Sequence, residues 1–197
     1  MSPVTITVPP SALHSLLGSY LNESNQTILF GFLLSFTFWN ILNIIAMNLP
    51  IPDKHLSRAD KIDLRNRLVS IIHGTLLLFL SGYNTYFAHS QCGEHNTQLE
   101  EYLLIISNGY FAYDLAAMAY LGILDRSMLI HHNICIIGMS FGLATGHGAD
   151  ILIGALFLTE ISNPAMHVRV ILRHLNLRYT RAYETTELTY MRNIKNH

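Results

Sequence analysis

The sequence predicts an all-α membrane protein, a polytopic transmembrane helical bundle of about five spans, and three observations lead to this fold class. Of the 197 residues, 50% are hydrophobic and 13% are charged, whereas about 25% are charged in an average soluble protein. The mean hydropathy is +0.30, and the apolar residues are gathered into long runs. A bilayer core takes about 20 apolar residues as a helix. Five stretches qualify: residues 27–49, 67–88, 101–123, 128–147 and 150–172.

The boundaries of the first three spans follow from the residues that flank them. The first span ends at Pro50, and the connection 50–66 is the longest between spans and also contains Pro52. Proline restricts the backbone and lacks a donor N–H, so it favours the end of a helix there. The second span starts after a charged stretch and ends at the polar loop 89–100, after which the third span begins.

The fourth and fifth spans are separated by only a few residues, which predicts a tight helical hairpin. Gly146 and Gly148 lie in this connection, and glycine tolerates the backbone conformations that a tight turn requires. Within the fifth span, Pro164 leaves the backbone carbonyl of Glu160 without its helical donor. The sequence therefore predicts a local break of the last span next to an acidic side chain.

The distribution of basic residues predicts the orientation of the spans. Every Lys and Arg lies in or beside the first connection, in the connection between the third and fourth spans, or at and after the end of the fifth span: Lys54, Arg58, Lys61, Arg65, Arg67, Arg126, Arg169, Arg173, Arg178, Arg181, Arg192 and Lys195. Basic residues favour the cytosolic side of a membrane. The N-terminus is therefore predicted to be lumenal or outside, and the C-terminus cytosolic.

Two segments flank the predicted membrane domain of residues 27–172. Residues 1–26 form a lumenal N-terminal segment without the basic and continuous apolar regions of a cleaved signal peptide, so the first span is expected to direct insertion. This segment contains two glycosylation motifs, with Asn22 and Asn25 as the candidate acceptors. Residues 173–197 are predicted to form a polar cytosolic tail.

Ionisable side chains inside the apolar spans mark the candidate functional site. They are His73, Asp114, His131, His132 and Glu160. A charged side chain at the centre of a membrane helix costs roughly 2.5–3.5 kcal/mol on insertion scales, and such residues mostly face a protein interior or a wet cavity. With a rise of about 1.5 Å per residue, they lie at middle to cytosolic depth on four helices. We therefore expect them to share a cavity open to the cytosol.

Helical spacing adds neighbours to these residues. Tyr110 and Asp114 are four positions apart, and Glu160 and Asn163 are three apart, so each pair shares one face of a helix. Tyr110, Asn163 and Pro164 are therefore expected to line the cavity or shape it.

These residues are compatible with several kinds of function. The net charge of −1 gives no basic field for nucleic acid. Adjacent histidines on a helix point about 100° apart, and no second histidine cluster accompanies them, so no metal site is predicted. A proton-coupled transporter would use similar buried residues, but five spans without an internal repeat do not favour it. General acid–base chemistry fits better, with His131 or His132 as the base and Asp114 orienting it.

Four segments in this order resemble the TLC-domain family (TRAM, LAG and CLN homology), which includes the ceramide synthases. The segments are Arg67-Leu68-Val69-Ser70-Ile71-Ile72-His73-Gly74, Gly109-Tyr110-Phe111-Ala112-Tyr113-Asp114-Leu115, His131-His132 and Thr159-Glu160-Ile161-Ser162-Asn163-Pro164. The resemblance covers about residues 60–175. Within the family, the chain looks closest to the branch of TLC-domain-containing protein 5, also called transmembrane protein 136.

The resemblance implies a multi-helix bundle in an endomembrane with a central cavity for lipid. In ceramide synthases, paired histidines and an aspartate belong to the motif held essential for transferring a fatty acyl group from acyl-CoA to a sphingoid amine. By position, His131, His132 and Asp114 are their counterparts here. Ceramide synthases continue with a longer signature containing further aspartates, and this chain does not have it. TLC domains usually have at least one more helix, so residues 173–197 are expected to be a truncated domain end, as in a short isoform.

The sequence thus predicts a multi-pass protein of membrane lipid metabolism or homeostasis. If it is an enzyme, an acyl-CoA-dependent N-acyltransferase-like activity is expected, with His73 and Glu160 in supporting roles, acyl-CoA as co-substrate and no resident cofactor. The alternative is a lipid-binding, lipid-sensing or helper protein without a reaction. Membrane lipids are the expected partners, with homo- or hetero-oligomers through membrane helices, and the endoplasmic reticulum or another endomembrane is the expected location. The plasma membrane stays open as an alternative.

Overall fold

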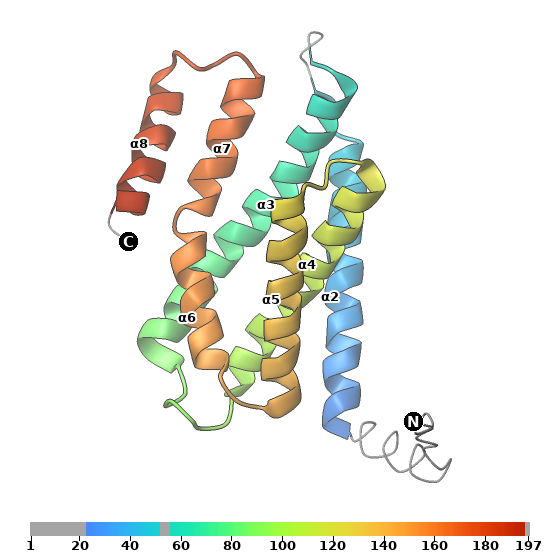
Figure 1. Ribbon diagram of the computed structural model, residues 1–197, viewed down its shortest axis with the longest axis vertical. Coiled ribbons are helices and arrows are strands. Elements are labelled where there is room, and N and C mark those ends of the chain that lie inside the picture. Colours follow the sequence, from blue (N-terminus) through green and yellow to red (C-terminus); the bar gives the residue numbers. More distant parts are fainter. Residues whose placement is uncertain (1–22, 52–55, 196–197) are drawn as a thin grey trace, which may run out of the picture.

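The computed structural model describes residues 23–51 and 56–195, and within these ranges every regular element is helical. Asn22 and most of the N-terminal segment lie outside them. The elements are α2 (Glu23–Met47), α3 (Arg58–Tyr83), the π-helical turn η1 (Asn84–Ala88), α4 (Gln98–Leu121), α5 (Arg126–Thr145), α6 (Ala149–Glu160), α7 (Asn163–His174) and α8 (Arg181–Lys195). The predicted all-α bundle is confirmed (Figure 1).

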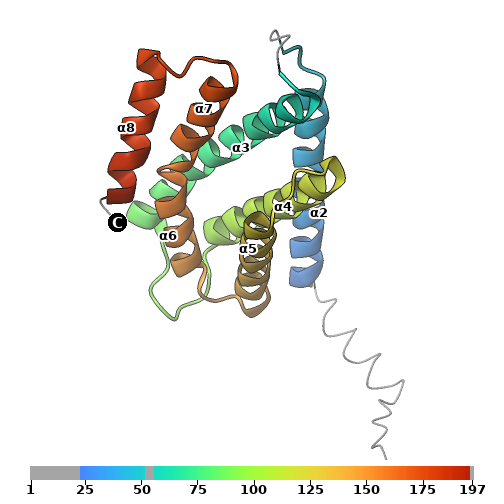
Figure 2. The same cartoon turned by 45° about the horizontal axis from the view of Figure 1, so that its top comes forward.

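Helix α4 is the inner helix of the bundle. It packs against α2, α5, α6 and α3, and α3 crosses the bundle diagonally on its way to α6 and α7 (Figure 2). Half of the α4 residues are buried, and these include the polar side chains of Glu100, Ser107, Asn108 and Asp114. In a bilayer such polar groups are stabilised only against protein or water, so the central place of α4 follows from its sequence.

Four helices are long and apolar enough to cross a membrane. They are Asn25–Met47, Arg58–Ala88, Arg126–Thr145 and Ala149–His174, and they cover four of the five predicted spans. The remaining predicted span forms α4, a helix of 24 residues that is not among these four because its polar residues lower its mean hydropathy. Large apolar side chains such as Phe30, Phe79 and Phe141 are about 70% exposed, as expected for surfaces covered by lipid.

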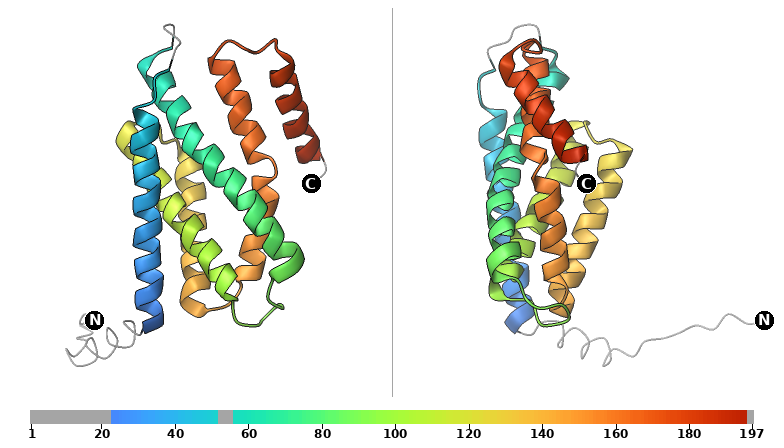
Figure 3. Two further views of the ribbon diagram at one scale, coloured as in Figure 1. Left: turned by 180° about the vertical axis from the view of Figure 1, so that it is seen from behind. Right: turned by 90° about the vertical axis from the view of Figure 1, so that its left-hand side faces the viewer.

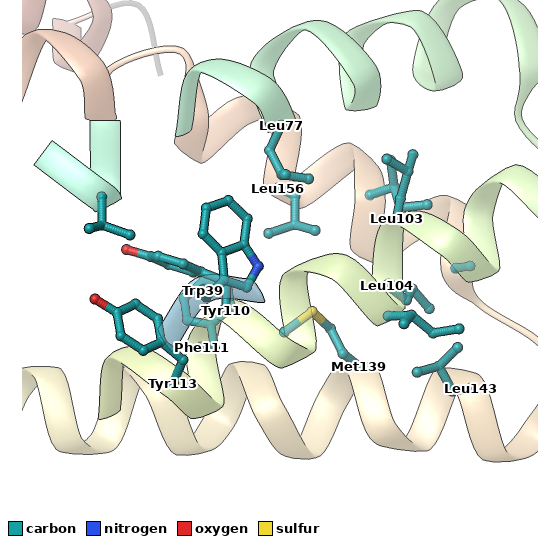
Figure 4. Close-up of a cluster of buried hydrophobic side chains, with 14 of the residues drawn as sticks. Trp39, Leu77, Leu103, Leu104, Tyr110, Phe111, Tyr113, Met139, Leu143 and Leu156 are labelled. Atoms are coloured by element: carbon teal, nitrogen blue, oxygen red, sulfur yellow. The ribbon is translucent and has the colours of Figure 1, made fainter. Parts of the chain in front are cut away.

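The apolar core lies where α2, α3, α4, α5 and α6 meet. Trp39, Leu77 and Tyr113 have no exposed surface. Figure 4 shows the aromatic side chains at one side of the cluster and Leu103, Leu104 and Leu143 at the other, with Leu77 and Leu156 beside Trp39 between them. Since lipid tails are as apolar as these side chains, close packing and buried hydrogen bonds hold such a core together more than exclusion of water does.

The predicted hairpin between the fourth and fifth spans is present and is closed by Asn96. Gly146 and Gly148 have φ values of 70° and 82°, which glycine adopts without strain. The Asn96 side chain donates to the Gly142 carbonyl (2.9 Å) and accepts from the Ala149 N–H (3.0 Å). This asparagine therefore joins the end of α5 to the start of α6.

The last predicted span is broken as expected. Helix α6 ends at Glu160, and α7 begins at Asn163 with Pro164 in its first turn, where a proline needs no donor. Residues 181–195, within the predicted polar tail, form α8, which packs antiparallel to α7 (Figure 1). The Tyr183 side chain is buried in this contact region. A polar sequence can form such a helix without a span-length apolar run because only one face is buried.

The ends of the bundle differ in charge. The starts of α3 and α5 and the ends of α4 and α7 lie together at one end, and the 89–97 loop and the α5–α6 turn lie at the other (Figure 1). The basic residues at the starts of α3 and α5 and the end of α7, among them Arg58, Arg126 and Arg173, are therefore at the first end. That this end faces the cytosol stays a prediction from the charge distribution.

Candidate functional site

The paired histidines of α5 face different surroundings. His132 is buried, with 4% of its surface exposed, whereas His131 is exposed. Neighbouring residues of a helix point about 100° apart, so only one of them can face the interior. The start of α5 is fixed by the Asp125 side chain, which accepts from the Met128 N–H at 2.8 Å. This cap sets the residue at which α5 begins.

Both ring nitrogens of His132 are engaged. Nδ1 lies 2.8 Å from the Met128 carbonyl oxygen, and Nε2 lies 2.9 Å from Oδ2 of Asp114. A carbonyl oxygen only accepts, so Nδ1 carries a proton and donates to it. The second bond then shares one further proton between Nε2 and the carboxyl oxygen. His132 has no ring nitrogen left for a substrate.

A buried chain of hydrogen bonds extends from this pair to α3. Asn66 donates to Oδ1 of Asp114 at 2.9 Å, and the Tyr113 hydroxyl donates to the Asn66 side-chain oxygen at 3.3 Å. Asn66, Tyr113 and Asp114 are each at most 6% exposed. The chain links α3, α4 and α5 at one level of the bundle and holds His132 in one orientation.

His131 occupies the outer side of this arrangement. Its ring lies edge-on to Phe111 and to His132, with ring centroids 5.7 and 5.5 Å apart. The thiol of Cys135 lies beside it, with Sγ 3.8 Å from Nε2. His131 is therefore the member of the pair that can contact a substrate. Sequence reasoning did not select Cys135, although its spacing of four residues from His131 was a usable signal.

His73 and Glu160 form a second buried pair. His73 is 1% exposed, and its Nδ1 lies 3.9 Å from Oε1 of Glu160. The imidazole stacks on the Tyr110 ring at 3.6 Å between centroids, with the Trp39 indole edge-on at 5.4 Å. Tyr110 thus packs on this histidine, and Nε2 of His73 has no hydrogen-bond partner among the described residues.

Glu160 is anchored where the last predicted span breaks. The Asn163 side chain donates to its Oε2 at 3.1 Å, so these two predicted neighbours do meet. A Cβ atom at Gly74 would lie 2.7 Å from the same oxygen and 3.6 Å from Cγ of Pro164. A glycine at this position allows α3 to approach the α6–α7 break closely.

The two buried pairs lie on either side of Phe111. Its ring centroid is 5.8 Å from that of His73 and 5.3 Å from that of His132. The structure therefore brings the predicted residues together, but the shared cavity expected from the sequence is not open at them. His73, Asp114, His132 and Glu160 are each at most 5% exposed, because neighbouring side chains pack directly on them.

Two grooves, each of about 480 Å³, lie elsewhere on the described surface. One is formed by the start of α3 and the end of α4 and includes Arg58, Tyr120 and Gly122. The other lies along the outer apolar side of α3, beside Ile72 and Phe79. None of the predicted site residues lines either groove.

A charged network between α3 and α7 was not anticipated from the sequence. Arg67 donates to Asp63 at 2.8 Å and to Nδ1 of His167 at 3.3 Å. His174 lies 3.3 Å from the Asp63 carboxylate and 3.6 Å from that of Asp60. The spacing of Asp63 and Arg67 indicates a helical ion pair, but the partners on α7 are distant in sequence. The network fixes α7 against the start of α3.

Among residues 23–51 and 56–195, no three His, Cys, Asp or Glu side chains are grouped closely enough to hold a metal ion. The glycosylation candidate Asn25 lies in the first turn of α2.

Comparison with known families agrees with the resemblance carried by the motifs. The family model described as the TLC domain matches residues 63–191, which is more than half of the chain and includes all five ionisable residues of the candidate site. No solved structure matches the chain. The chain is thus an integral membrane protein that belongs to the TLC-domain family.

Proposed function

We propose that this membrane protein transfers a fatty acyl group to a lipid acceptor and that His131 is the residue that contacts the substrate. The observation that carries the proposal is the asymmetry of the paired histidines. His132 is buried and bound through both ring nitrogens, whereas His131 is exposed. One histidine is thus held as a support, and the other is available for chemistry.

In this proposal His131 acts as a general base. It takes a proton while the acyl carbonyl is attacked and returns that proton to the leaving group, a role for which the near-neutral pKa of imidazole is suited. His132 and Asp114 are positioning residues, since they fix the start of α5 without reaching the substrate. His73 and Glu160 support the packing of α3 against the α6–α7 break.

The substrate class follows from the location. An acyl donor with a soluble activated head, such as acyl-CoA, would approach from the basic end of the bundle, which is predicted to be cytosolic, and its chain would stay in the bilayer. The resemblance to ceramide synthases supports an amine as acceptor. The likeness to the TLC-domain-containing protein 5 branch, and a location in the endoplasmic reticulum or another endomembrane, are part of the same proposal.

A lipid-binding or lipid-sensing role without a reaction is the second candidate. It is favoured by the burial of His73, Asp114, His132 and Glu160, because polar side chains that bind one another between helices also serve to hold a membrane bundle together.

The two functions are separated by replacing His131 alone. The purified protein in lipid nanodiscs is incubated with long-chain acyl-CoA and amine- or hydroxyl-bearing lipid acceptors, and acylated products are measured by mass spectrometry. His131→Ala should lower the transfer rate about 10²–10⁴-fold, the range for losing a general base. Asn133→Ala is the matched control, because Asn133 is exposed near the same turn and bonds only to the Leu129 carbonyl among the hydrogen bonds found.

Cells lacking the protein provide the second readout. If His131→Ala restored their lipid profile as fully as the wild type, the acyl-transfer proposal would fail and the binding role would stand.

A further inference from the structure

We infer that Cys135 is a nucleophile that carries the acyl group as a thioester and that His131 is its base. The inference rests on the proposed function and specifies its chemistry as two successive transfers. It begins from the distance between Cys135 Sγ and the His131 ring, which is 3.8 Å to Nε2 and 4.0 Å to Nδ1. Both values lie within hydrogen-bonding reach of a sulfur atom.

The imidazole of His131, beside the thiol, is held in place by neighbouring side chains. The His131 ring packs edge-on against Phe111 and against His132, and His132 is in turn held by Asp114. A nucleophile within reach of a base, with the base held by further groups, is the general pattern of covalent catalysis. Cys135 and His131 are four residues apart on α5, so their side chains lie on one face.

The direction of that face is given by two glycines further along α5. Gly138 and Gly142 follow His131 by seven and eleven residues and therefore share its face. A Cβ atom at Gly138 would lie 3.7 Å from the Leu152 side chain of α6, and one at Gly142 would lie 2.9 Å from it. The face that carries Cys135 and His131 is thus turned towards α6.

Helices α5 and α6 meet at their connecting turn and diverge towards the end that carries His131 (Figure 3). Cys135 is half-buried and His131 is exposed, whereas Gly142, close to the turn, packs against Leu152. The thiol therefore lies on the side where the two helices separate, within an apolar helix. In the proposal, the acyl chain reaches it there from the bilayer.

The first transfer exchanges one thioester for another. His131 takes the proton of the Cys135 thiol, and Sγ attacks the carbonyl carbon of the acyl thioester. The new bond from Sγ to carbon forms, the bond from carbon to the donor sulfur breaks, and the departing thiolate receives the proton from His131. No oxidant, reductant or metal is required.

In the second transfer, an amine or hydroxyl group of the lipid acceptor attacks the thioester on Cys135. The bond from carbon to Sγ breaks, and an amide or ester bond forms. The proton of the acceptor passes through His131 to the cysteine thiolate, which restores the starting state. The acyl group moves from donor to acceptor, and the protein is unchanged.

The test uses the two cysteines of the chain, Cys92 and Cys135. Cys92 is exposed in the loop at the opposite end of the bundle, which makes it a matched control. Wild-type protein in nanodiscs is incubated with an alkyne-tagged long-chain acyl-CoA without acceptor, and the label is mapped by mass spectrometry and tested for cleavage by neutral hydroxylamine. Lipid acceptor is then added.

The wild type and Cys92→Ser should carry a hydroxylamine-sensitive label on Cys135 that the acceptor removes. Cys135→Ala should carry no such label and should lose transfer, and His131→Gln should be labelled at least tenfold more slowly. Circular dichroism of each variant shows whether its fold is retained. A buried cysteine that only fills space would tolerate replacement by alanine, so full transfer by a folded Cys135→Ala variant would overturn the inference.

The outcomes separate this inference from the proposed function. Transfer by the wild type without any label on Cys135, or equal labelling of Cys92 and Cys135, would overturn the thioester and leave direct transfer with His131 as base. A label on Cys135 that no acceptor removes would support the thioester and contradict transfer to lipid. If the wild type neither transferred nor became labelled, both would fail.

Discussion

At the scale of single residues, the polar groups buried in this protein are held mainly by one another. Asp114 accepts from Asn66 through one oxygen and pairs with His132 through the other, so its removal affects two helices at once. In a buried pair, the larger cost of a substitution comes from the group that is left without its partner.

We expect Asp114→Ala to destabilise the protein by about 3–5 kcal/mol, the range for breaking a buried ion pair on one side. Tyr113→Phe is the matched control, because it removes only the hydroxyl at the end of the same chain and should cost about 0.5–1.5 kcal/mol. Thermal unfolding in detergent, followed by circular dichroism, measures both. Equal destabilisation by the two substitutions would show that Asp114 is not the central member of the chain.

Gly74 provides a second prediction at this scale. In Gly74→Ala the new methyl group would meet Oε2 of Glu160 at 2.7 Å, so the buried carboxylate must shift and its hydrogen bond from Asn163 is disturbed, at a cost of about 1–3 kcal/mol. Gly154→Ala is the control on α6. Nothing lies within 4 Å of its Cβ position, and alanine is a better helix former than glycine by about 1 kcal/mol. Melting temperatures should therefore fall for the first variant and hold or rise for the second.

The different roles of His131 and His132 were not predictable from the sequence. Both lie in the same apolar run, and which of them faces inward depends on the rotation of α5, which the glycine contacts with α6 determine. The contact between Glu160 and Asn163 was expected from their spacing of three residues. The proximity of His73 to Glu160 was expected from their similar depth in the membrane. The stacking of His73 on Tyr110, however, depends on how closely α3 approaches α4, and side-chain packing sets that distance.

At the scale of helices, Glu100 connects η1, the 89–97 loop and α4. It has no exposed surface, and its carboxylate accepts from the Ser90 N–H at 2.8 Å and the Thr97 N–H at 2.7 Å. Burial raises the pKa of Glu100, but the hydrogen bonds from Ser90 and Thr97 outweigh it and leave that pKa below its ordinary 4.5. The ionised carboxylate is therefore the form that stabilises the start of α4.

Glu100→Gln should lower stability by about 1.5–3 kcal/mol at neutral pH, the range for hydrogen bonds to a charged group. Because the pKa is lowered on folding, this stabilisation is complete above pH 4.5 and is lost as the pH falls through the folded-state pKa. The difference in melting temperature between wild type and variant should thus be constant from pH 6 to 8 and shrink below 4.5. A difference that grew on acidification would contradict the lowered pKa.

Some helices could be predicted from the sequence, and others could be predicted only in part or not at all. Apolar length was sufficient for α2 and α5, and Pro164 was sufficient for the break between α6 and α7. For α3 it was sufficient only from Arg67 onward, because residues 58–66 were predicted to be a connection and instead form the charged start of this helix. Helix α8 was not expected because its sequence is polar, and its contact with α7 depends on a few side chains such as Tyr183. Asp114 alone indicated that α4 lies inside the bundle. The burial of Glu100 and Asn108 could not be predicted, because it depends on their partners in distant segments.

At the scale of the whole molecule, the alternation of the helices places Cys92 at one end and the start of α5 at the other. If the basic end is cytosolic, Cys92 and a cysteine introduced at the exposed Ser127 lie on opposite sides of the membrane. A membrane-impermeant maleimide, added to intact cells or sealed microsomes, should then react with only one of the two from either side. In a Cys135→Ala background, Cys92 should be labelled only from the outer or lumenal side and Ser127→Cys only from the cytosol. The reverse pattern would invert the predicted topology.

The Asn96 bridge across the α5–α6 turn has a mechanical consequence. With the turn fixed, α5 and α6 separate by rotating about it. His131 lies 15 residues from Gly146, which is about 22 Å along the helix. A rotation of α5 by about 10° would move His131 by ~4 Å and Gly142, near the turn, by only ~1 Å, and it would break the neighbouring bond from His132 to Asp114 on α4. Helix α5 is thereby held near both of its ends, to the start of α6 through Asn96 and to α4 through His132, and residues between these two points move least.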